Sequence, residues 1–134
     1  INFNVLINYP SIPVLGICFG FQLMAMAYGS HIEKLENPKI NIYQDISINK
    51  ECKSCLYKNI NEDSFKGYQY HNDYIINKPT NFEITSINKQ DNTIESIENI
   101  ELLRFGTQYH PENSDIGNDI LNNFINLCLD ISSN

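Results

Sequence analysis

Cys18 is the side chain of this sequence best placed to act as a nucleophile. It lies between Gly16 and Gly20, after the apolar residues 12–15 and before the apolar residues 23–27. This pattern predicts a strand, a sharp turn and a helix, because glycine neighbours relieve clashes where the central residue has a strained backbone. The same turn with serine is the nucleophile elbow of hydrolases. Here it would expose a sulfur at a helix N-terminus, where the helix dipole and free N–H groups favour a thiolate.

A candidate base and its orienting group lie far along the chain. His110 and Glu112 follow a strand-like run and come more than ninety positions after Cys18. Residues two apart in an extended chain point to the same face. Pro111 lies between them and cannot donate to a sheet ladder, so we expect the strand to stop there and leave the pair in a loop. Cys18, His110 and Glu112 therefore form a candidate nucleophile, base and orienting carboxylate.

Three segments of the chain resemble the class I glutamine amidotransferases of the Cys-His-Glu type. They are residues 13–22 (PVLGICFGFQ), residues 106–112 (GTQYHPE) and residues 117–124 (GNDILNNF). Their order and wide separation also match the family, and the resemblance covers nearly the whole chain. It implies an α/β fold, a three-layer flavodoxin-like domain whose sheet is mainly parallel with appended antiparallel hairpins.

The same resemblance implies the roles of individual residues. Cys18 would be the nucleophile, His110 the base and Glu112 its orienting group. The backbone N–H of Phe19 would be one oxyanion donor, and Gln22 would lie beside the bound glutamine.

Further residues of the substrate site follow from the resemblance. Gly16 belongs to the cysteine turn. Residues 70–73, which include His71 and Asp73, occupy the place of a His-Gly-Asp-like motif near the amino-acid end of the substrate, with Asn72 in place of the glycine.

The reaction implied for the family is hydrolysis of the glutamine side-chain amide through a cysteine thioester. The ammonia released passes to a synthetase domain or subunit. The order and spacing of residues 70–73, 79–84 and 106–110 are similar to the GMP-synthase-like branch. The expected partners are L-glutamine and a synthetase, and no cofactor is expected in this chain, because ATP and Mg²⁺ would belong to the synthetase.

Members of the family carry a segment before the cysteine turn that supplies the first strands and a Gly-rich loop with a second oxyanion donor. Residues 1–12 show no such loop, so we expect an N-terminally truncated domain. Two alternatives stay open. One is a standalone γ-glutamyl hydrolase or peptidase with the same triad, and the other is an inactive remnant that acts as a binding domain.

Length and charge limit the other function classes. A chain of 134 residues fits one domain, which we place at residues 1–134. The net charge of -7 argues against nucleic acid as a partner, since that would need a basic face. No apolar run is long enough to cross a membrane. Four cysteines without a secretory signal predict reduced thiols in the cytoplasm.

Cys52 and Cys55 have the spacing of half a zinc site. Zinc needs about four ligands, and neither a second cysteine pair nor a nearby histidine pair supplies them. We therefore expect no metal site and a structural role for both cysteines.

Hydrophobic patterning predicts the elements that would position these residues. The early strand, turn and helix indicate a parallel sheet, and the pattern in the middle of the chain indicates hairpins. The predicted strands are residues 13–17, 30–35, 40–48, 65–70, 82–88, 93–97 and 102–109, and the predicted helices are residues 20–29 and 116–129.

Overall fold

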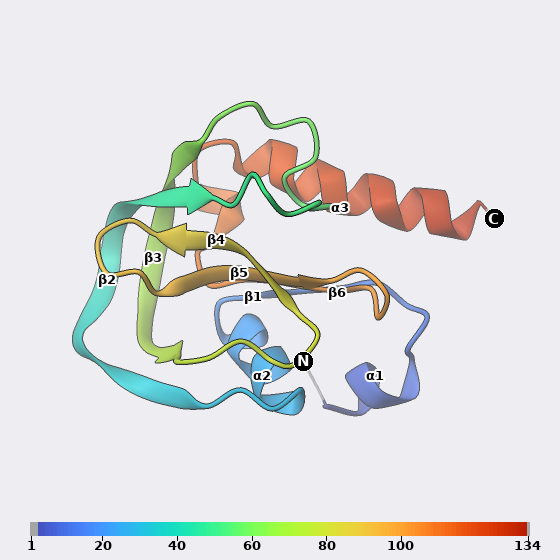
Figure 1. Ribbon diagram of the computed structural model, residues 1–134, viewed down its shortest axis with the longest axis horizontal. Helices are drawn as coiled ribbons and strands as arrows, with labels where there is room; N and C mark the ends of the chain where they lie inside the picture. Colours follow the sequence, from blue (N-terminus) through green and yellow to red (C-terminus); the bar gives the residue numbers. More distant parts are fainter. Residues whose placement is uncertain (1–2, 134) are drawn as a thin grey trace.

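The computed structural model describes residues 3–133, and its strands form one six-stranded sheet (Figure 1). The strands are ordered β1-β6-β5-β4-β2-β3 across this sheet. The elements in chain order are α1 (Phe3–Asn8), β1 (Val14–Ile17), α2 (Phe19–Ala27), β2 (Ile32–Ile48), β3 (Ser64–Ile75), β4 (Glu83–Asn88), β5 (Ile94–Asn99), β6 (Arg104–Thr107), the 3-10 helix η1 (Pro111–Asn113) and α3 (Gly117–Ser132).

The sheet is mixed, with a larger antiparallel part than the sequence predicted. In the described residues only β1 and β6 pair in parallel, whereas the other four neighbouring pairs are antiparallel. The cause is the length of the connections. Residues 89–93 join β4 to β5 and residues 100–103 join β5 to β6, and both are too short for the crossover that a parallel pair requires. The α/β architecture itself is confirmed.

Two apolar clusters lie on opposite faces of β1, β5 and β6 and make the fold three-layered. Neighbouring residues of β1 show the division, because Val14 packs with α1 and α2 while Leu15 packs with α3. Figure 1 shows α3 on one side of these strands and α1 with α2 on the other. The first cluster contains Leu6, Phe21, Met24 and Ala25 of α1 and α2 together with Tyr28 directly after α2, and the second contains Ile120, Phe124 and Leu127 of α3.

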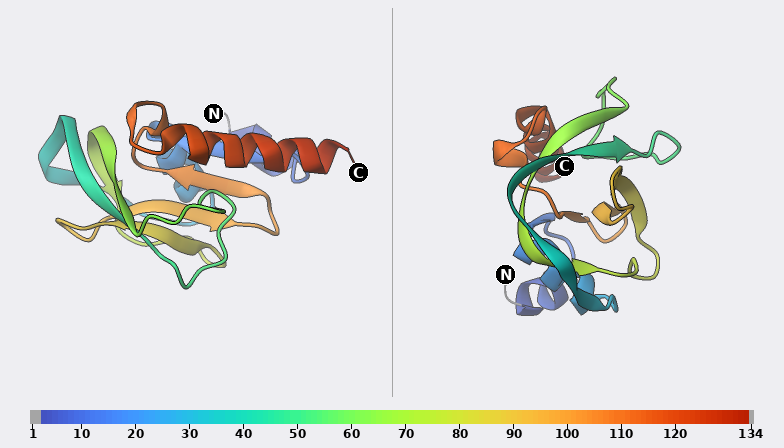
Figure 2. Two further views of the ribbon diagram at one scale, coloured as in Figure 1. Left: turned by 90° about the horizontal axis from the view of Figure 1, so that it is seen from above. Right: turned by 90° about the vertical axis from the view of Figure 1, so that its left-hand side faces the viewer.

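The long strands β2 and β3 curl away from the helical layers, as Figure 2 shows. The sequence predicted two strands, 30–35 and 40–48, where the structure has the single strand β2. Its register against β3 shifts between Lys34 and Lys39, so the residues around Pro38 bulge while the pairing resumes beyond them. β3 also continues to Ile75, past the predicted end at residue 70. The continuous ribbon of β2 and β3 therefore extends along the cysteine turn.

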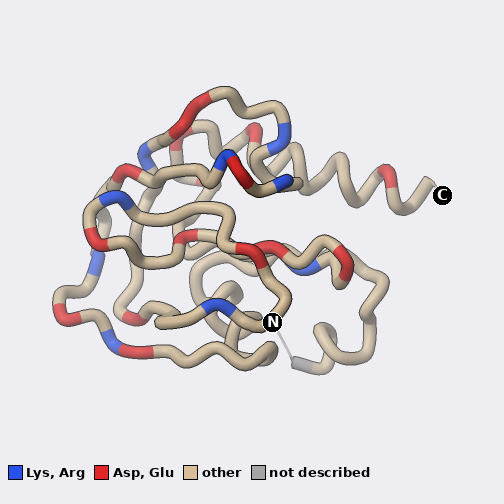
Figure 3. Tube along the Cα trace, viewed as in Figure 1, with Lys and Arg blue, Asp and Glu red and all other residues tan. Residues whose placement is uncertain are grey.

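The beginning of the chain holds a helix that the sequence did not predict. α1 has only six residues and no acidic residue in its first turn, so its sequence signal is weak. We predicted that residues 1–12 lack an oxyanion loop. Two of these residues, Ile1 and Asn2, lie outside the described residues. The charged residues are spread over strands and loops with both signs interspersed (Figure 3). Among the described helices, none has the length and apolar character needed to span a bilayer.

The buried guanidinium of Arg104 fastens α1 and the segment after it to β6. The side chain is fully buried, and its Nε donates to the hydroxyl of Tyr28 at 3.2 Å. A buried cation needs hydrogen-bond acceptors, and here backbone carbonyls supply them. The carbonyls that accept from its two terminal nitrogens belong to Leu6, Tyr9, Ile12, Leu102 and Leu103.

We expect Arg104→Met to lower the free energy of unfolding by about 3 kcal/mol or more, because several buried carbonyls lose their donor together. Urea unfolding with an unchanged slope measures the loss. Lys34→Met, at an exposed position of β2, is the matched control and should change stability little. A loss below about 1 kcal/mol in Arg104→Met would show that water replaces the guanidinium.

Candidate active site

Parallel pairing of β1 with β6 brings the candidate nucleophile next to the candidate base segment. Ile17 at the end of β1 is in register with Thr107 at the end of β6. The carboxyl ends of neighbouring parallel strands meet at one sheet edge, which is where sites of α/β folds form. Accordingly, the backbone N–H of Cys18 donates to the carbonyl of Thr107 at 2.8 Å. Residues that follow β1 and residues that follow β6 therefore share one edge.

Cys18 occupies the strained turn that its glycine neighbours predict. Its backbone has φ 55° and ψ −107°, and α2 begins at the next residue. A Cβ at Gly16 would lie 2.6 Å from the backbone oxygen of Gly20, so the turn closes this tightly only with glycine at position 16. The predicted strand, turn and helix are thus confirmed. Phe19 begins the helix with an exposed side chain, and its backbone N–H bonds to the Cys18 sulfur.

β3 is a third element of the site, running beside both candidate residues. The thiol of Cys18 donates to the carbonyl of Tyr70 at 3.5 Å. Two residues earlier, the carbonyl of Tyr68 accepts from the backbone N–H of His110 at 3.0 Å, and the two rings meet edge to face. Because the carbonyls of strand residues two apart point to the same side of the strand, β3 contacts Cys18 and His110 within one short stretch.

His110 and Glu112 are in contact in the structure. The Nδ1 of His110 lies 3.2 Å from Oε2 of Glu112, and an ionised carboxylate only accepts, so the ring proton is on Nδ1. Nε2 is then the ring atom with a free lone pair, and it is buried without a hydrogen-bond partner in the described part of the chain. A ring held in this way has the tautomer that a general base needs.

Ser114 supports the histidine and was missed in the sequence. Its hydroxyl donates to the carbonyl of His110 at 2.6 Å and accepts from the backbone N–H of Tyr68 at 2.8 Å. It ties the start of η1 to β3. The sequence could have indicated this role only through the position of Ser114, four residues after His110. A serine shortly after a proline is too common in loops to identify a functional residue.

The electrostatic environment of Cys18 opposes the thiolate that the sequence predicted. Burial raises the pKa of the thiol above its ordinary value, and the negative charges of Glu112 and Glu95 raise it further. The backbone N–H of Phe19 lowers the pKa as expected for a helix N-terminus, but burial has the larger effect. The thiol is therefore protonated in the resting protein and needs a base to become a nucleophile.

Two buried glutamines complete the floor of the turn. The Nε2 of Gln22 donates to the carbonyl of Asp73 at 2.8 Å and to Oε1 of Gln108 at 3.1 Å. Gln108 in turn directs its Nε2 to the Cys18 sulfur at 3.9 Å. The sequence analysis did not select Gln108, although its place two residues before His110 puts it on the same face of an extended chain. The amide donors of Gln22 are thus both used within the protein.

The class I glutamine amidotransferase family model, "Glutamine amidotransferase class-I", matches residues 5–127. The chain belongs to this family. The glutamine-hydrolysing GMP synthase of Listeria innocua is 34% identical over 120 residues, which are 87% of this chain and 22% of that protein. In Methanococcus aeolicus, a separate GMP synthase subunit, also named glutamine-hydrolysing, is 33% identical over 119 residues, 87% of this chain and 61% of that protein.

Solved structures give the same family fold. A structure from Thermoplasma acidophilum, described as a subunit of GMP synthase, superposes with a TM-score of 0.80 at 26% identity, covering 90% of this chain and 59% of that one. A glutamine amidotransferase from Thermotoga maritima has a TM-score of 0.69 at 20% identity, covering 96% and 52%. This chain thus spans about a fifth of the length of the Listeria protein and about three fifths of the length of the Methanococcus subunit.

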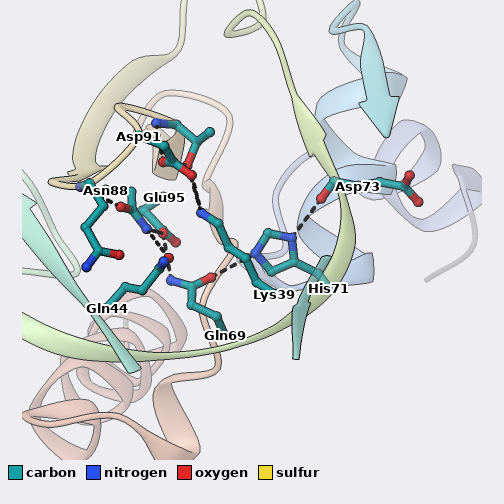
Figure 4. Close-up of polar contacts among 10 residues, drawn as sticks. Lys39, Gln44, Gln69, His71, Asp73, Asn88, Asp91 and Glu95 are labelled. Carbon is teal, nitrogen blue, oxygen red and sulfur yellow. Dashed lines mark hydrogen bonds and ion pairs between the residues drawn. The ribbon is translucent and has the colours of Figure 1, made fainter. Parts of the chain in front are cut away.

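His71 and Asp73 lie next to this site and are linked to each other. Nδ1 of His71 lies 2.8 Å from the backbone carbonyl of Asp73, and Nε2 lies 2.8 Å from Oε1 of Gln69 (Figure 4). Burial lowers the pKa of His71 to about 4, so the ring is neutral near neutral pH. The Asp73 carboxylate points away from this contact. The substrate-side roles of both residues stay predictions.

Cys52 and Cys55 have different hydrogen-bond partners. The Cys52 sulfur accepts from Nδ2 of Asn49 at 2.9 Å, whereas the backbone N–H of Cys55 donates to Glu98. Within residues 3–133, no three His, Cys, Asp or Glu side chains gather as metal ligands would. Burial raises the pKa of both thiols, which makes them poor nucleophiles.

Proposed function

We propose that this chain is the glutamine-hydrolysing domain of a GMP synthase, with Cys18, His110 and Glu112 as its catalytic residues. One observation carries the proposal. The strained turn with Cys18 and the His110–Glu112 pair lie at the carboxyl ends of two neighbouring parallel strands, with the free histidine nitrogen buried at that edge. The relatives named GMP synthase support the choice of branch.

In this mechanism His110 takes the proton from the Cys18 thiol, and the sulfur attacks the side-chain amide carbon of glutamine. The carbonyl electron pair moves to the amide oxygen, which the backbone N–H of Phe19 stabilises. The tetrahedral intermediate collapses, the C–N bond breaks and His110 returns its proton to the leaving nitrogen, releasing ammonia. Water, deprotonated by His110, then cleaves the γ-glutamyl thioester and yields glutamate and the free thiol.

The raised pKa of Cys18 agrees with this role for His110. A protonated thiol reacts slowly, so its proton must be removed as the carbon–sulfur bond forms. Glu112 keeps the proton of the resting imidazole on Nδ1 and stabilises the imidazolium that forms. We infer that ammonia passes to a synthetase that uses ATP and Mg²⁺, either in the same polypeptide or as a separate protein, since the relatives include both a long GMP synthase and a separate subunit. The cytoplasm is the compartment we expect.

A glutamine analogue with an alkylating group in place of the amide tests the function in the full protein. We expect one label per chain, on the peptide that contains Cys18, and protection by excess glutamine. Cys52, Cys55 and Cys128 serve as internal controls for general thiol reactivity. Label on those cysteines, or labelling of Cys18 that glutamine does not slow, would contradict the proposal.

Substrate comparison separates the proposed function from the γ-glutamyl hydrolase alternative. Glutamate release from glutamine should exceed release from γ-glutamyl dipeptides, and added ammonium should replace glutamine in the synthetase reaction. Faster cleavage of the dipeptides would favour the hydrolase. A chain that binds its partner yet releases no glutamate and takes no label would be a binding remnant.

A further inference from the structure

A buried carboxyl group lies behind the candidate site and has no role in the mechanism above. Glu95 on β5 is fully buried. Its Oε2 accepts from Nε2 of Gln69 at 2.7 Å and from Nδ2 of Asn88 at 2.9 Å, while its Oε1 has no partner in the described part of the chain. Figure 4 shows these side chains meeting between β3 and β5, with His71 at the far end.

Glu95, Gln69 and His71 form a continuous chain of short hydrogen bonds, which we call the Glu95 chain. The Gln69 amide lies between the other two, with Nε2 toward Glu95 and Oε1 2.8 Å from Nε2 of His71. The other ring nitrogen, Nδ1, lies 2.8 Å from the carbonyl of Asp73. Both ring nitrogens of His71 therefore face an oxygen atom.

Counting protons along the Glu95 chain gives a definite result. Both nitrogens of His71 face oxygen acceptors, but a neutral imidazole has only one N–H. Either the ring is doubly protonated, or the Gln69 amide is turned over so that its nitrogen donates to Nε2 of His71. In the second case the amide oxygen faces Oε2 of Glu95, which must then carry a proton. Both solutions hold one proton more than neutral His71 with ionised Glu95.

Burial decides where this proton is. It lowers the pKa of His71 to about 4 and raises that of Glu95 to about 7, so the carboxyl group holds the proton more readily. Lys39 favours ionised Glu95 and neutral His71, whereas Asp91, paired with Lys39 at 2.6 Å, has the opposite effects. The negative charge of Glu95 raises the pKa of Cys18 and of Tyr109, and His110 lowers the pKa of His71.

The Glu95 chain is connected to the candidate nucleophile by further hydrogen bonds. The carbonyl of Asp73 accepts from His71 and also from Gln22, which contacts Gln108, whose Nε2 faces the Cys18 sulfur. In addition, the backbone carbonyl of Glu95 accepts from the backbone N–H of Gln108 at 2.7 Å. The backbone around Asp73 is thus held from both sides.

We propose that Glu95 is a positioning residue that, as the protonated acid, donates to Gln69 and so fixes His71 on the carbonyl of Asp73 at the substrate side of the site. This inference rests on the proposed function for its effect on glutamine. When Glu95 loses its proton, the Gln69 oxygen has no donor on that side. The amide then returns its nitrogen to the carboxylate, and neutral His71 can no longer satisfy both of its neighbours.

Infrared difference spectroscopy detects the proton without any need for activity. A protonated carboxyl group has a carbonyl stretching band apart from that of a carboxylate. The spectrum of the full protein minus that of Glu95→Gln should show this band at about pH 6 and lose it by about pH 9, since the proton leaves as pH rises through the folded pKa. Absence of the band at about pH 6 would overturn the proposal.

The pH dependence of glutamine KM tests the positioning role. In the unmodified protein we expect KM to rise about fivefold between about pH 6 and about pH 8.5, corresponding to one lost hydrogen bond. Glu95→Gln keeps an N–H donor toward Gln69 at every pH, so this rise should disappear while kcat near pH 6 is retained. Glu98→Gln replaces another buried carboxylate of β5 that contacts Ser54 instead, and it should keep the rise.

The outcomes separate this inference from the proposed function. If glutamate is released but KM in Glu95→Gln rises as in the unmodified protein, the positioning role is wrong. If no glutamate is released at any pH, the proposed function fails and the effect on glutamine fails with it. The infrared band would then still show whether Glu95 holds the proton.

Discussion

Replacing Cys18 by alanine lowers glutamate release by about 10⁵- to 10⁶-fold, which is the loss typical of removing the nucleophile of a catalytic triad. Without the sulfur no thioester forms, and the remaining backbone donors act on a substrate that only water can attack. The fold should survive the change, because the side chain is half-buried and its contacts with Tyr70 and Gln108 are long. Steady-state glutamate release measures the loss.

Cys128→Ala is the matched control for this substitution, since it removes a thiol from α3, away from the turn. Its activity should equal that of the unmodified protein. Thermal unfolding should show similar midpoints for both variants. If Cys18→Ala still forms glutamate at the normal rate, Cys18 is not the nucleophile.

His110→Asn should lower glutamate release by about 10⁴- to 10⁶-fold. Asparagine is similar in size but cannot shuttle a proton between sulfur and nitrogen, and the raised pKa of Cys18 leaves the thiol without its base. His31→Asn is the control, because His31 is exposed just before β2 and should not affect the rate. Single-turnover measurements would locate the loss in thioester formation.

Glu112→Gln should cost less, about 10²-fold, because the side chain is half exposed and water screens its charge. The glutamine oxygen can still accept from Nδ1 of His110 and keep the tautomer. Equal activity in Glu112→Gln would mean that Glu112 does not orient the ring. A loss below tenfold in His110→Asn would assign the base to another group.

The local signals in the sequence predicted the turn and the candidate triad. Gly16 predicts the turn because a side chain two residues before Cys18 would clash with the backbone of Gly20. The spacing of His110 and Glu112 about Pro111 predicts a pair in a loop beyond the strand, whereas in the structure Glu112 lies in η1 and His110 directly precedes it. α3 follows from its amphipathic pattern. These features depend on neighbours in the sequence, so they can be found without the structure.

The buried polar chain behind the site could not be predicted in the same way. Glu95 and Gln69 are polar residues within short strand-like runs, and such side chains are mostly exposed in folded proteins. In the structure both are fully buried, because the curled sheet closes over them. The raised pKa of the Cys18 thiol could not be predicted for the same reason. The helix N-terminus can be recognised in the sequence, whereas the burial of Cys18 depends on its packing against β3.

Pairing of β1 with β6 ties the assembly of the site to the order in which the polypeptide is made. Residues 14–17 can pair only after residues 104–107 have been synthesised. The loop between the two strands must therefore close late, at an entropic cost that grows with its length. A nascent chain still emerging from the ribosome therefore has its cysteine turn but not its histidine. The candidate triad can form only after residues 110–112 have been synthesised, so a nascent chain that ends before them holds the thiol without its candidate base.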